Sequence, residues 1–185
     1  MRIGQLTGDT EHGVWNMSEA YPLMLSTLSD LGCLPKINDK LSWLPLDVAA
    51  NAVCDIALAD QERSRASTGR KSCEVYNVVN NDTSTSFMDL LGWLKEINKD
   101  PFEILEPREW SEKLEKMERH PAKALLGLWQ QAFKDNAHED LERVAKFDTK
   151  NAKEVSQTMG DIRPVDEKLF AKIWKWVEGE MAQKT

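Results

Sequence analysis

The chain opens with Arg2-Ile3-Gly4-Gln5-Leu6-Thr7-Gly8-Asp9, continues with Gly13-Val14-Trp15-Asn16, and carries Ser42-Trp43-Leu44-Pro45-Leu46-Asp47 further along. Ile3 and Leu6 flank a glycine, a pattern compatible with a strand. Gly8, Asp9 and Gly13 favour a loop, because glycine and aspartate adopt the backbone conformations that turns require. The opening of the chain therefore predicts a strand followed by a loop.

Helical patterns follow on both sides of the tryptophan at position 43. From Ser18 the apolar residues recur at helical spacing, with Ser18 or Asn16 as the cap and Gly32 at the end of the helix. Residues 41–44 predict a short strand or an extended segment. A second helix is expected after Pro45, with Asp47 as its cap.

The clearest strand pattern lies at residues 74–79, which read Glu-Val-Tyr-Asn-Val-Val. β-Branched and aromatic residues of this kind are enriched in strands. The charged stretch at residues 61–71 predicts a surface loop before it. Three short strands separated by helices do not make a broad parallel sheet, so either another polypeptide completes the sheet or the fold has rearranged.

The remaining sequence is mostly helical in pattern. Ser86 and Asp89 have the spacing of a capping box, and an apolar stripe follows them. Further helices are expected after Pro107, after Pro121, over residues 150–159 and over residues 164–181. We therefore expect an α+β, mostly helical fold, in which a few short strands accompany a bundle of amphipathic helices. We expect a single domain over residues 1–185, with a sheet-associated pocket segment at 1–80 and a helical segment at 81–185.

Composition excludes several classes of protein. A net charge of −7 argues against nucleic acid as a partner, since that binding depends on clustered Lys and Arg. No apolar run reaches the length of about 20 residues that a membrane span needs, so we expect a cytoplasmic protein without a membrane partner. Cys33, Cys54 and Cys73 are odd in number and far apart, which predicts neither a disulfide framework nor a metal site.

The segments quoted at the start, together with several later ones, resemble the C-terminal, substrate-binding part of thioester reductase domains. These domains end fungal nonribosomal peptide synthetases and related carboxylic acid reductases, an extended branch of the short-chain dehydrogenase/reductase superfamily. The later matching segments are Tyr76-Asn77-Val78-Val79-Asn80, residues 87–94, Pro107-Arg108-Glu109-Trp110, Phe147-Asp148-Thr149 and Ser156-Gln157-Thr158-Met159. The resemblance is collinear over nearly the whole chain, but the nucleotide-binding half of the family is absent.

The resemblance implies a role in binding substrate rather than a reaction centre. It implies that the pocket positions are Gln5, Leu6, Gly8, Trp15 and Trp43. Short-chain reductases use a tyrosine and a lysine four residues later, whereas Tyr21 is followed at that distance by Leu25 and Tyr76 by Asn80. The family's Gly-x-Gly-x-x-Gly loop is also absent. NADPH is therefore implied for the full-length family, and no cofactor is expected on this chain alone.

Two hypotheses follow. In the first, the chain is the substrate-binding subdomain of a thioester reductase-like protein and positions a carrier-bound acyl or peptidyl chain, with a carrier protein or the missing nucleotide-binding half as partner. In the second, it is a truncated reductase relic that acts as a cofactor-independent cyclase, isomerase or dehydratase of fungal secondary metabolism, with Trp15, Trp43 and an acid such as Asp9 in the pocket. For these two tryptophans, packing in a core is as good an explanation as lining a pocket. A homodimer could cover an exposed strand edge near residues 75–79.

Overall fold

The computed structural model describes residues 1–66, 73–135 and 146–183 of the chain. Its strands are β1 (Arg2–Ile3), β2 (Leu6–Thr7), β3 (Cys33–Pro35), β4 (Leu44–Pro45), β5 (Asn77–Val78) and β6 (Glu103–Leu105). Its helices are α1 (Ala20–Leu31), α2 (Leu46–Ala66), α3 (Phe87–Ile97), α4 (Pro107–Lys116), the 3-10 helix η1 (Pro121–Leu125), α5 (Leu126–Asp135), α6 (Lys150–Val155), α7 (Gln157–Gly160) and α8 (Glu167–Ala182). The expected fold class, α+β and mostly helical, is confirmed.

The strands form three separate parallel pairs. β1 lies beside β5 with Arg2 opposite Asn77, β2 lies beside β4, and β3 lies beside β6. The strand predicted at the start of the chain is interrupted, because Gly4 and Gln5 separate two strands that pair with different partners. The strand predicted at residues 74–79 is shorter than expected, since only Asn77 and Val78 lie opposite a partner strand.

Three local predictions near the first two helices are wrong. The N-cap of α1 is Glu19, which makes no side-chain cap bond, while Asn16 Oδ1 accepts the backbone N–H of Ser18 instead. Asp47 lies inside the first turn of α2, and its carboxylate binds Thr10 rather than the helix terminus. Residues 61–66 continue α2 instead of forming a loop, because Gln61, Glu62 and Arg63 are good helix formers. The rest of that predicted loop, 67–71, lies outside the described residues.

Other local predictions are confirmed. Gly32 ends α1 with φ at 62°, a left-handed conformation that glycine adopts without steric cost. The capping box of α3 is complete, since Ser86 Oγ accepts the backbone N–H of Asp89 and the Asp89 carboxylate accepts the backbone N–H of Ser86. Pro107 occupies the first turn of α4, where its missing N–H costs no hydrogen bond.

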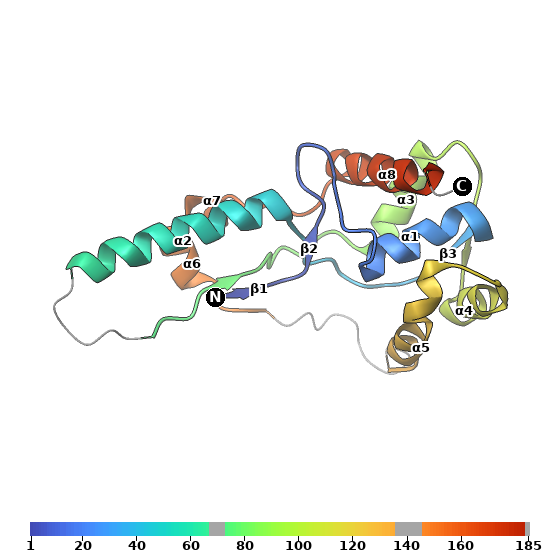
Figure 1. Cartoon of the computed structure of the whole chain (residues 1–185), viewed down its shortest axis with the longest axis horizontal. Helices are drawn as coiled ribbons and strands as arrows, with labels where there is room; N and C mark the ends of the chain where they lie inside the picture. The colour runs from blue at the N-terminus through green and yellow to red at the C-terminus, as the bar shows by residue number, and fades with distance from the viewer. Residues whose placement is uncertain (67–72, 136–145, 184–185) are drawn as a thin grey trace.

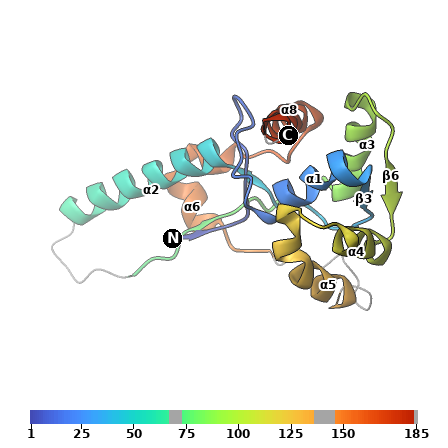
Figure 2. The ribbon, with the colours of Figure 1, turned by 45° about the vertical axis from the view of Figure 1, so that its right-hand side comes forward.

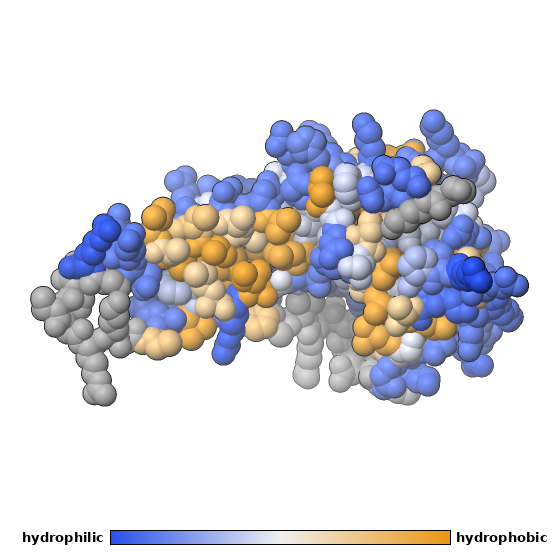
Figure 3. Space-filling view, in the orientation of Figure 1, coloured by the Kyte–Doolittle hydropathy of each residue, from blue (hydrophilic) through white to orange (hydrophobic). Residues whose placement is uncertain are grey.

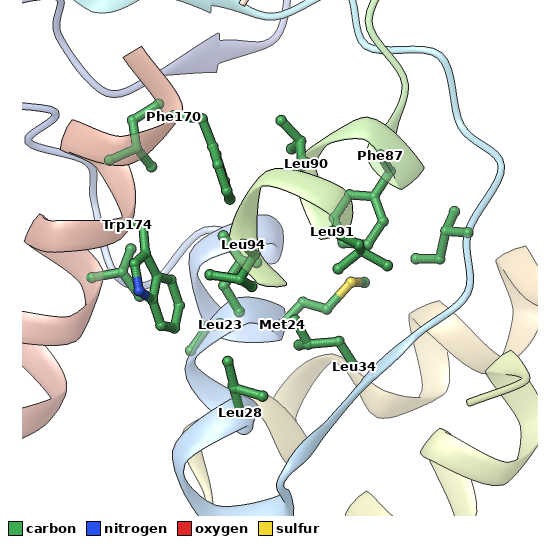
Figure 4. Close-up of a cluster of buried hydrophobic side chains, with 14 of the residues drawn as sticks. Leu23, Met24, Leu28, Leu34, Phe87, Leu90, Leu91, Leu94, Phe170 and Trp174 are labelled. Carbon is green, nitrogen blue, oxygen red and sulfur yellow. The ribbon is translucent and has the colours of Figure 1, made fainter. Parts of the chain in front are cut away.

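Two hydrophobic clusters divide the molecule into a helical body and an α2 lobe (Figures 1 and 2). In the helical body, the apolar faces of α1, α3 and α8 converge with β3 (Figure 4). The side chains labelled there are Leu23, Met24, Leu28, Leu34, Phe87, Leu90, Leu91, Leu94, Phe170 and Trp174. In the α2 lobe, one face of α2 packs on β4, β5, α6 and α7 through Leu44, Ala49, Ala52, Ile56, Tyr76, Val78, Ala152 and Met159. Each cluster draws residues from both sides of position 80, the predicted boundary between the two segments.

No helix within the described ranges is both long and apolar enough to cross a membrane.

Candidate functional site

The loop between β2 and α1 is fixed against two helices. A Cβ atom on Gly8 would lie 2.5 Å from the carbonyl oxygen of Gly13, and Gly13 has φ at 72° where it meets the backbone of α8 at Ile173. Only glycine fits both positions, since a side chain would collide with backbone atoms. The Asp9 carboxylate accepts the backbone N–H groups of residues 11, 12 and 14, which closes the loop on itself.

Two further contacts tie this loop to its neighbours. Asp47 Oδ1 in α2 accepts the backbone N–H of Thr10 at 3.0 Å, and Oδ2 accepts the Thr10 hydroxyl. From the other side, Lys172 Nζ in α8 donates to the Thr10 carbonyl oxygen at 2.7 Å. Thr10 is therefore held between α2 and α8, at the place where the α2 lobe meets the helical body.

A cavity of about 740 Å³ opens beside Thr10. It lies near the carboxyl ends of the parallel strands β2 and β4, the edge at which ligands commonly bind in open α/β sheets. Its lining comes from the loop, α2, α7 and the segment that leads into α8: Thr10, Pro45, Val48, Asp55, Gln157, Thr158, Asp161, Ile162, Arg163, Pro164, Asp166, Lys168, Leu169 and Lys172. Its volume is in the range of pockets that bind small organic molecules.

Several polar groups in this lining are already engaged. The Asp55 carboxylate accepts hydrogen bonds from the hydroxyls of Ser156 (2.7 Å) and Thr158 (3.0 Å). These bonds hold the pKa of Asp55 below its ordinary value, and the bond from Ser156 is the largest cause. Asp166 caps α8 by accepting the backbone N–H of Leu169. These groups shape the wall of the cavity and are poorly placed to exchange protons with a ligand.

Two cations in the lining remain open to a ligand. The side chains of Arg163 and Lys168 are exposed and form no hydrogen bond or ion pair with the residues that the structure describes. Apolar side chains, among them Val48, Ile162 and Leu169, complete the surface. The lining therefore combines apolar surface with two unpaired cations, beside the carboxylates of Asp55, Asp161 and Asp166.

A second cavity, of about 770 Å³, lies in the helical body beside α4 and α5. Charges at its rim are paired with each other: Lys36 with Glu106 at 3.3 Å and Arg108 with Glu112 at 3.0 Å. Asp39 also lines it, and burial raises the pKa of that carboxyl. Because these charges are paired with each other, this cavity is a weaker candidate for a ligand site than the cavity beside Thr10.

Trp15 and Trp43, which were predicted as pocket residues, lie in the core. Trp43 is 1% exposed and Trp15 is 4% exposed. Their rings meet edge to face with centroids 4.9 Å apart, and Tyr21 packs on Trp43 at 4.7 Å. The indole Nε1 of Trp15 donates to Glu19.

The other three predicted residues are spread around β2. Gln5 is exposed and donates to the carbonyl oxygen of Leu6, Leu6 packs on the α2 lobe, and Gly8 begins the fixed loop. None of the five residues predicted for a pocket lines either cavity, although Gly8 positions Thr10, which does. Their role in binding stays a prediction. Arg163 and Lys168 were missed, because no local pattern marks two exposed cations on either side of a proline.

Neither tyrosine has the environment of a reductase catalytic tyrosine, whose pKa a neighbouring lysine lowers. Burial, with the charge of Asp39 as a smaller cause, raises the pKa of Tyr21 to about 12. The hydroxyl of Tyr76 donates to Glu74 at 2.7 Å, which raises the pKa of Tyr76 as well. Both phenols are held neutral at physiological pH.

The glycines nearest β1 and β2 pack against other residues of this chain. Its sequence has no Gly-x-Gly-x-x-Gly turn, and Gly4 and Gly8, the glycines nearest β1 and β2, meet Val79 and Gly13 of this same chain. Within residues 1–66, 73–135 and 146–183, no group of three or more His, Cys, Asp or Glu could hold a metal ion.

No family model matches the chain. An adenylate-forming reductase of Stachybotrys bisbyi is 42% identical over 57 residues, which is 31% of this chain and 5% of that protein. An adenylate-forming reductase of Heterobasidion annosum is 26% identical over an alignment of 192 residues, which covers 96% of this chain and 17% of that protein. The chain thus spans a small part of the curated relatives it matches.

Solved structures with a similar fold are also reductase domains. The reductase domain of a nonribosomal peptide synthetase from Mycobacterium tuberculosis superposes with a TM-score of 0.71 at 16% identity, over 100% of this chain and 46% of that one. The fold is therefore that of part of such a reductase domain. The homologues of this chain are fungal nonribosomal peptide synthetases, adenylate-forming reductases and polyketide synthases, so the resemblance predicted from sequence is confirmed.

Proposed function

We propose that this chain is the substrate-binding part of a thioester reductase-like protein of natural-product biosynthesis. It positions an acyl or peptidyl chain that a carrier protein delivers, and it does not reduce that chain with NADPH by itself. The observation that carries the proposal is the cavity beside Thr10, with its apolar wall and the unpaired cations Arg163 and Lys168. The similarity to reductase domains supplies the class of substrate.

In this proposal the acyl or peptidyl chain lies along Val48, Ile162 and Leu169, and the cations hold an anionic group on the arm that carries the thioester. Gly8 and Leu6 set the position of the wall at Thr10. Trp15, at the end of the loop, packs on Trp43 in the core, and Gln5 is exposed just before β2. In this proposal a nicotinamide-binding partner brings the reaction centre.

The alternative of a cofactor-independent cyclase, isomerase or dehydratase gains no specific support. The Asp9 carboxylate accepts three backbone N–H groups, which lower its pKa; the bond from His12 is the largest cause. Asp9 is therefore ionised at neutral pH and is a poor proton donor. Trp15 and Trp43 pack against each other instead of lining an open space.

The test is a binding titration of the chain with NADPH and, separately, with a carrier protein loaded with an acyl thioester. We expect the loaded carrier to raise the thermal midpoint, NADPH to leave it unchanged, and no product to form. Arg163→Ala and Lys168→Ala should each weaken binding of the loaded carrier several-fold, whereas Lys175→Ala, which removes an exposed cation of α8 outside the cavity, should not. Equal binding by all three variants, or product formed from the thioester by the chain alone, contradicts the proposal.

A further inference from the structure

The second cavity, beside α4 and α5, holds a half-buried carboxylate that has no partner in the chain. Asp39 lies in the segment after β3 and lines this cavity. Its carboxylate forms no hydrogen bond or ion pair with residues 1–66, 73–135 and 146–183. Burial raises the pKa of Asp39, as expected where no cation or donor stabilises the charged form. A carboxylate withdrawn from water usually has a partner, so Asp39 points to a ligand that the chain does not itself supply.

The backbone around Asp39 is fixed independently of its carboxylate. The carbonyl oxygen of Asp39 accepts the backbone N–H of Phe87, at the start of α3, at 2.9 Å. The backbone N–H of Lys36 donates to the carbonyl oxygen of Leu105 in β6 at 2.7 Å. Ile37, between these two anchors, is 7% exposed and packs in the core of the helical body. Asp39 is therefore held at the cavity wall by contacts that leave its carboxylate free.

The other charged groups of the lining do not neutralise Asp39. Lys36 Nζ lies 3.3 Å from the Glu106 carboxylate, and Arg108 Nε lies 3.0 Å from that of Glu112. The two remaining groups, which are exposed and pair neither with each other nor with Asp39, are Glu115 and Lys134. The lining thus carries three cations and four carboxylates: Lys36, Arg108 and Lys134 against Asp39, Glu106, Glu112 and Glu115. This balance favours a cation as the ligand.

Apolar surface lies beside the carboxylate. Ile37, Pro107 and Phe133 line the same cavity, and the ring of Phe133 packs edge to face on Trp110 with centroids 6.3 Å apart. α4 and α5 pack on each other at one end of the molecule (Figures 1 and 2). Figure 3 shows a largely hydrophilic surface around one apolar patch at this end. The cavity therefore offers an apolar wall next to a single uncompensated negative charge.

We propose that this cavity binds a small organic amine in its ammonium form, with the ammonium group at Asp39 and the apolar body of the amine against Ile37 and Phe133. An ionised carboxylate only accepts hydrogen bonds, and a cationic donor gives the stronger bond. A metal ion fits less well, because no group of three or more His, Cys, Asp or Glu in the described part of the chain could hold one. The site shares no lining residue with the cavity beside Thr10, so it is independent of the proposed function.

The test is a titration of the full chain at neutral pH, followed by NMR of its backbone amides, with three probes that share one aromatic body. Phenethylamine carries an ammonium group, phenethyl alcohol a neutral hydroxyl and phenylacetate a carboxylate. We expect phenethylamine to bind saturably and to shift the amides of residues 36–39 and 107–115, which carry most of the lining. The other two probes should bind at least about tenfold more weakly, because only the ammonium group compensates Asp39.

Two variants locate the charge that binds the amine. Asp39→Asn keeps the size of the side chain and removes its charge, so it should weaken phenethylamine at least about tenfold and leave phenethyl alcohol unchanged. Its thermal midpoint should equal or exceed that of the parent, because the carboxylate has no bond to lose. Glu115→Gln, which removes an exposed carboxylate of the same lining, is the matched control and should change binding by less than about twofold.

Four results overturn the inference. Absence of saturable binding of phenethylamine shows that there is no amine site. Equal binding of phenethylamine and phenethyl alcohol shows that apolar contact alone is responsible, and tightest binding of phenylacetate places an anion at Lys134 instead. The fourth result is an Asp39→Asn variant that is folded and binds phenethylamine as the parent does.

Discussion

Asp47 in the first turn of α2 and Thr10 in the loop before α1 are joined by two hydrogen bonds, from the backbone N–H of Thr10 and from its hydroxyl. The two residues lie 37 positions apart in sequence, and their contact places the wall of the cavity against α2. The carboxylate therefore connects the loop to the α2 lobe.

Asp47→Ala should lower the free energy of unfolding by roughly 1–3 kcal/mol, because it removes a charged acceptor from two donors. It should also speed amide hydrogen exchange over residues 8–14, which the contact helps to hold. Asp60→Ala, which removes another carboxylate of the same helix, is the control and should change both quantities little. Equal effects of the two substitutions would show that Thr10 does not depend on Asp47.

Trp43 should be required for folding rather than only for binding. It is 1% exposed and contacts Trp15 and Tyr21, so Trp43→Ala removes a large side chain from a filled core. The expected loss is about 3–5 kcal/mol in a denaturant titration. Leu128→Ala, at an exposed residue, should stay within about 0.5 kcal/mol of the parent. If Trp43→Ala instead keeps the stability of the parent and loses only acyl binding, the side chain of Trp43 lines a binding pocket.

The helices of this protein were predictable because their signals are local. Ser86 and Asp89 lie within one turn of each other, and the stripe of α3 that follows them is buried as its spacing predicts. Asp47 shows where local reasoning fails. Its position after Pro45 fits a helix cap, but the carboxylate has a better partner in Thr10, and that contact depends on the tertiary fold.

The cavity could not be predicted for the same reason. Its lining joins Thr10 and Val48 to Arg163 and Leu169, which come from opposite ends of the chain. No spacing rule links such residues. The tryptophans were ambiguous because an aromatic side chain beside a turn fits a core and a pocket equally well, and only the packing of Trp15 on Trp43 distinguishes the two environments.

The cap of α3 gives a smaller and well-defined prediction. Ser86→Ala removes the acceptor of the Asp89 backbone N–H and should cost about 1 kcal/mol. Ser86→Thr keeps a hydroxyl at the cap and should recover most of that loss. Thermal unfolding of the two variants at neutral pH decides the matter, and an alanine variant as stable as the threonine variant would mean that the cap contributes little.

Tyr21 predicts how stability depends on alkaline pH. Burial raises its pKa from 10.0 to about 12 in the folded chain, so the folded state holds the phenol proton more tightly than the unfolded state does. The resulting stability is complete below pH 10 and is lost as the pH rises through about 12. Ultraviolet difference absorbance should show one phenolate that forms near pH 12 and is missing in Tyr21→Phe. Asp39→Asn should shift that transition to lower pH, because the charge of Asp39 is one of the causes of the raised pKa. A Tyr21 that ionises near pH 10 in the folded chain would contradict the buried position on which this prediction depends.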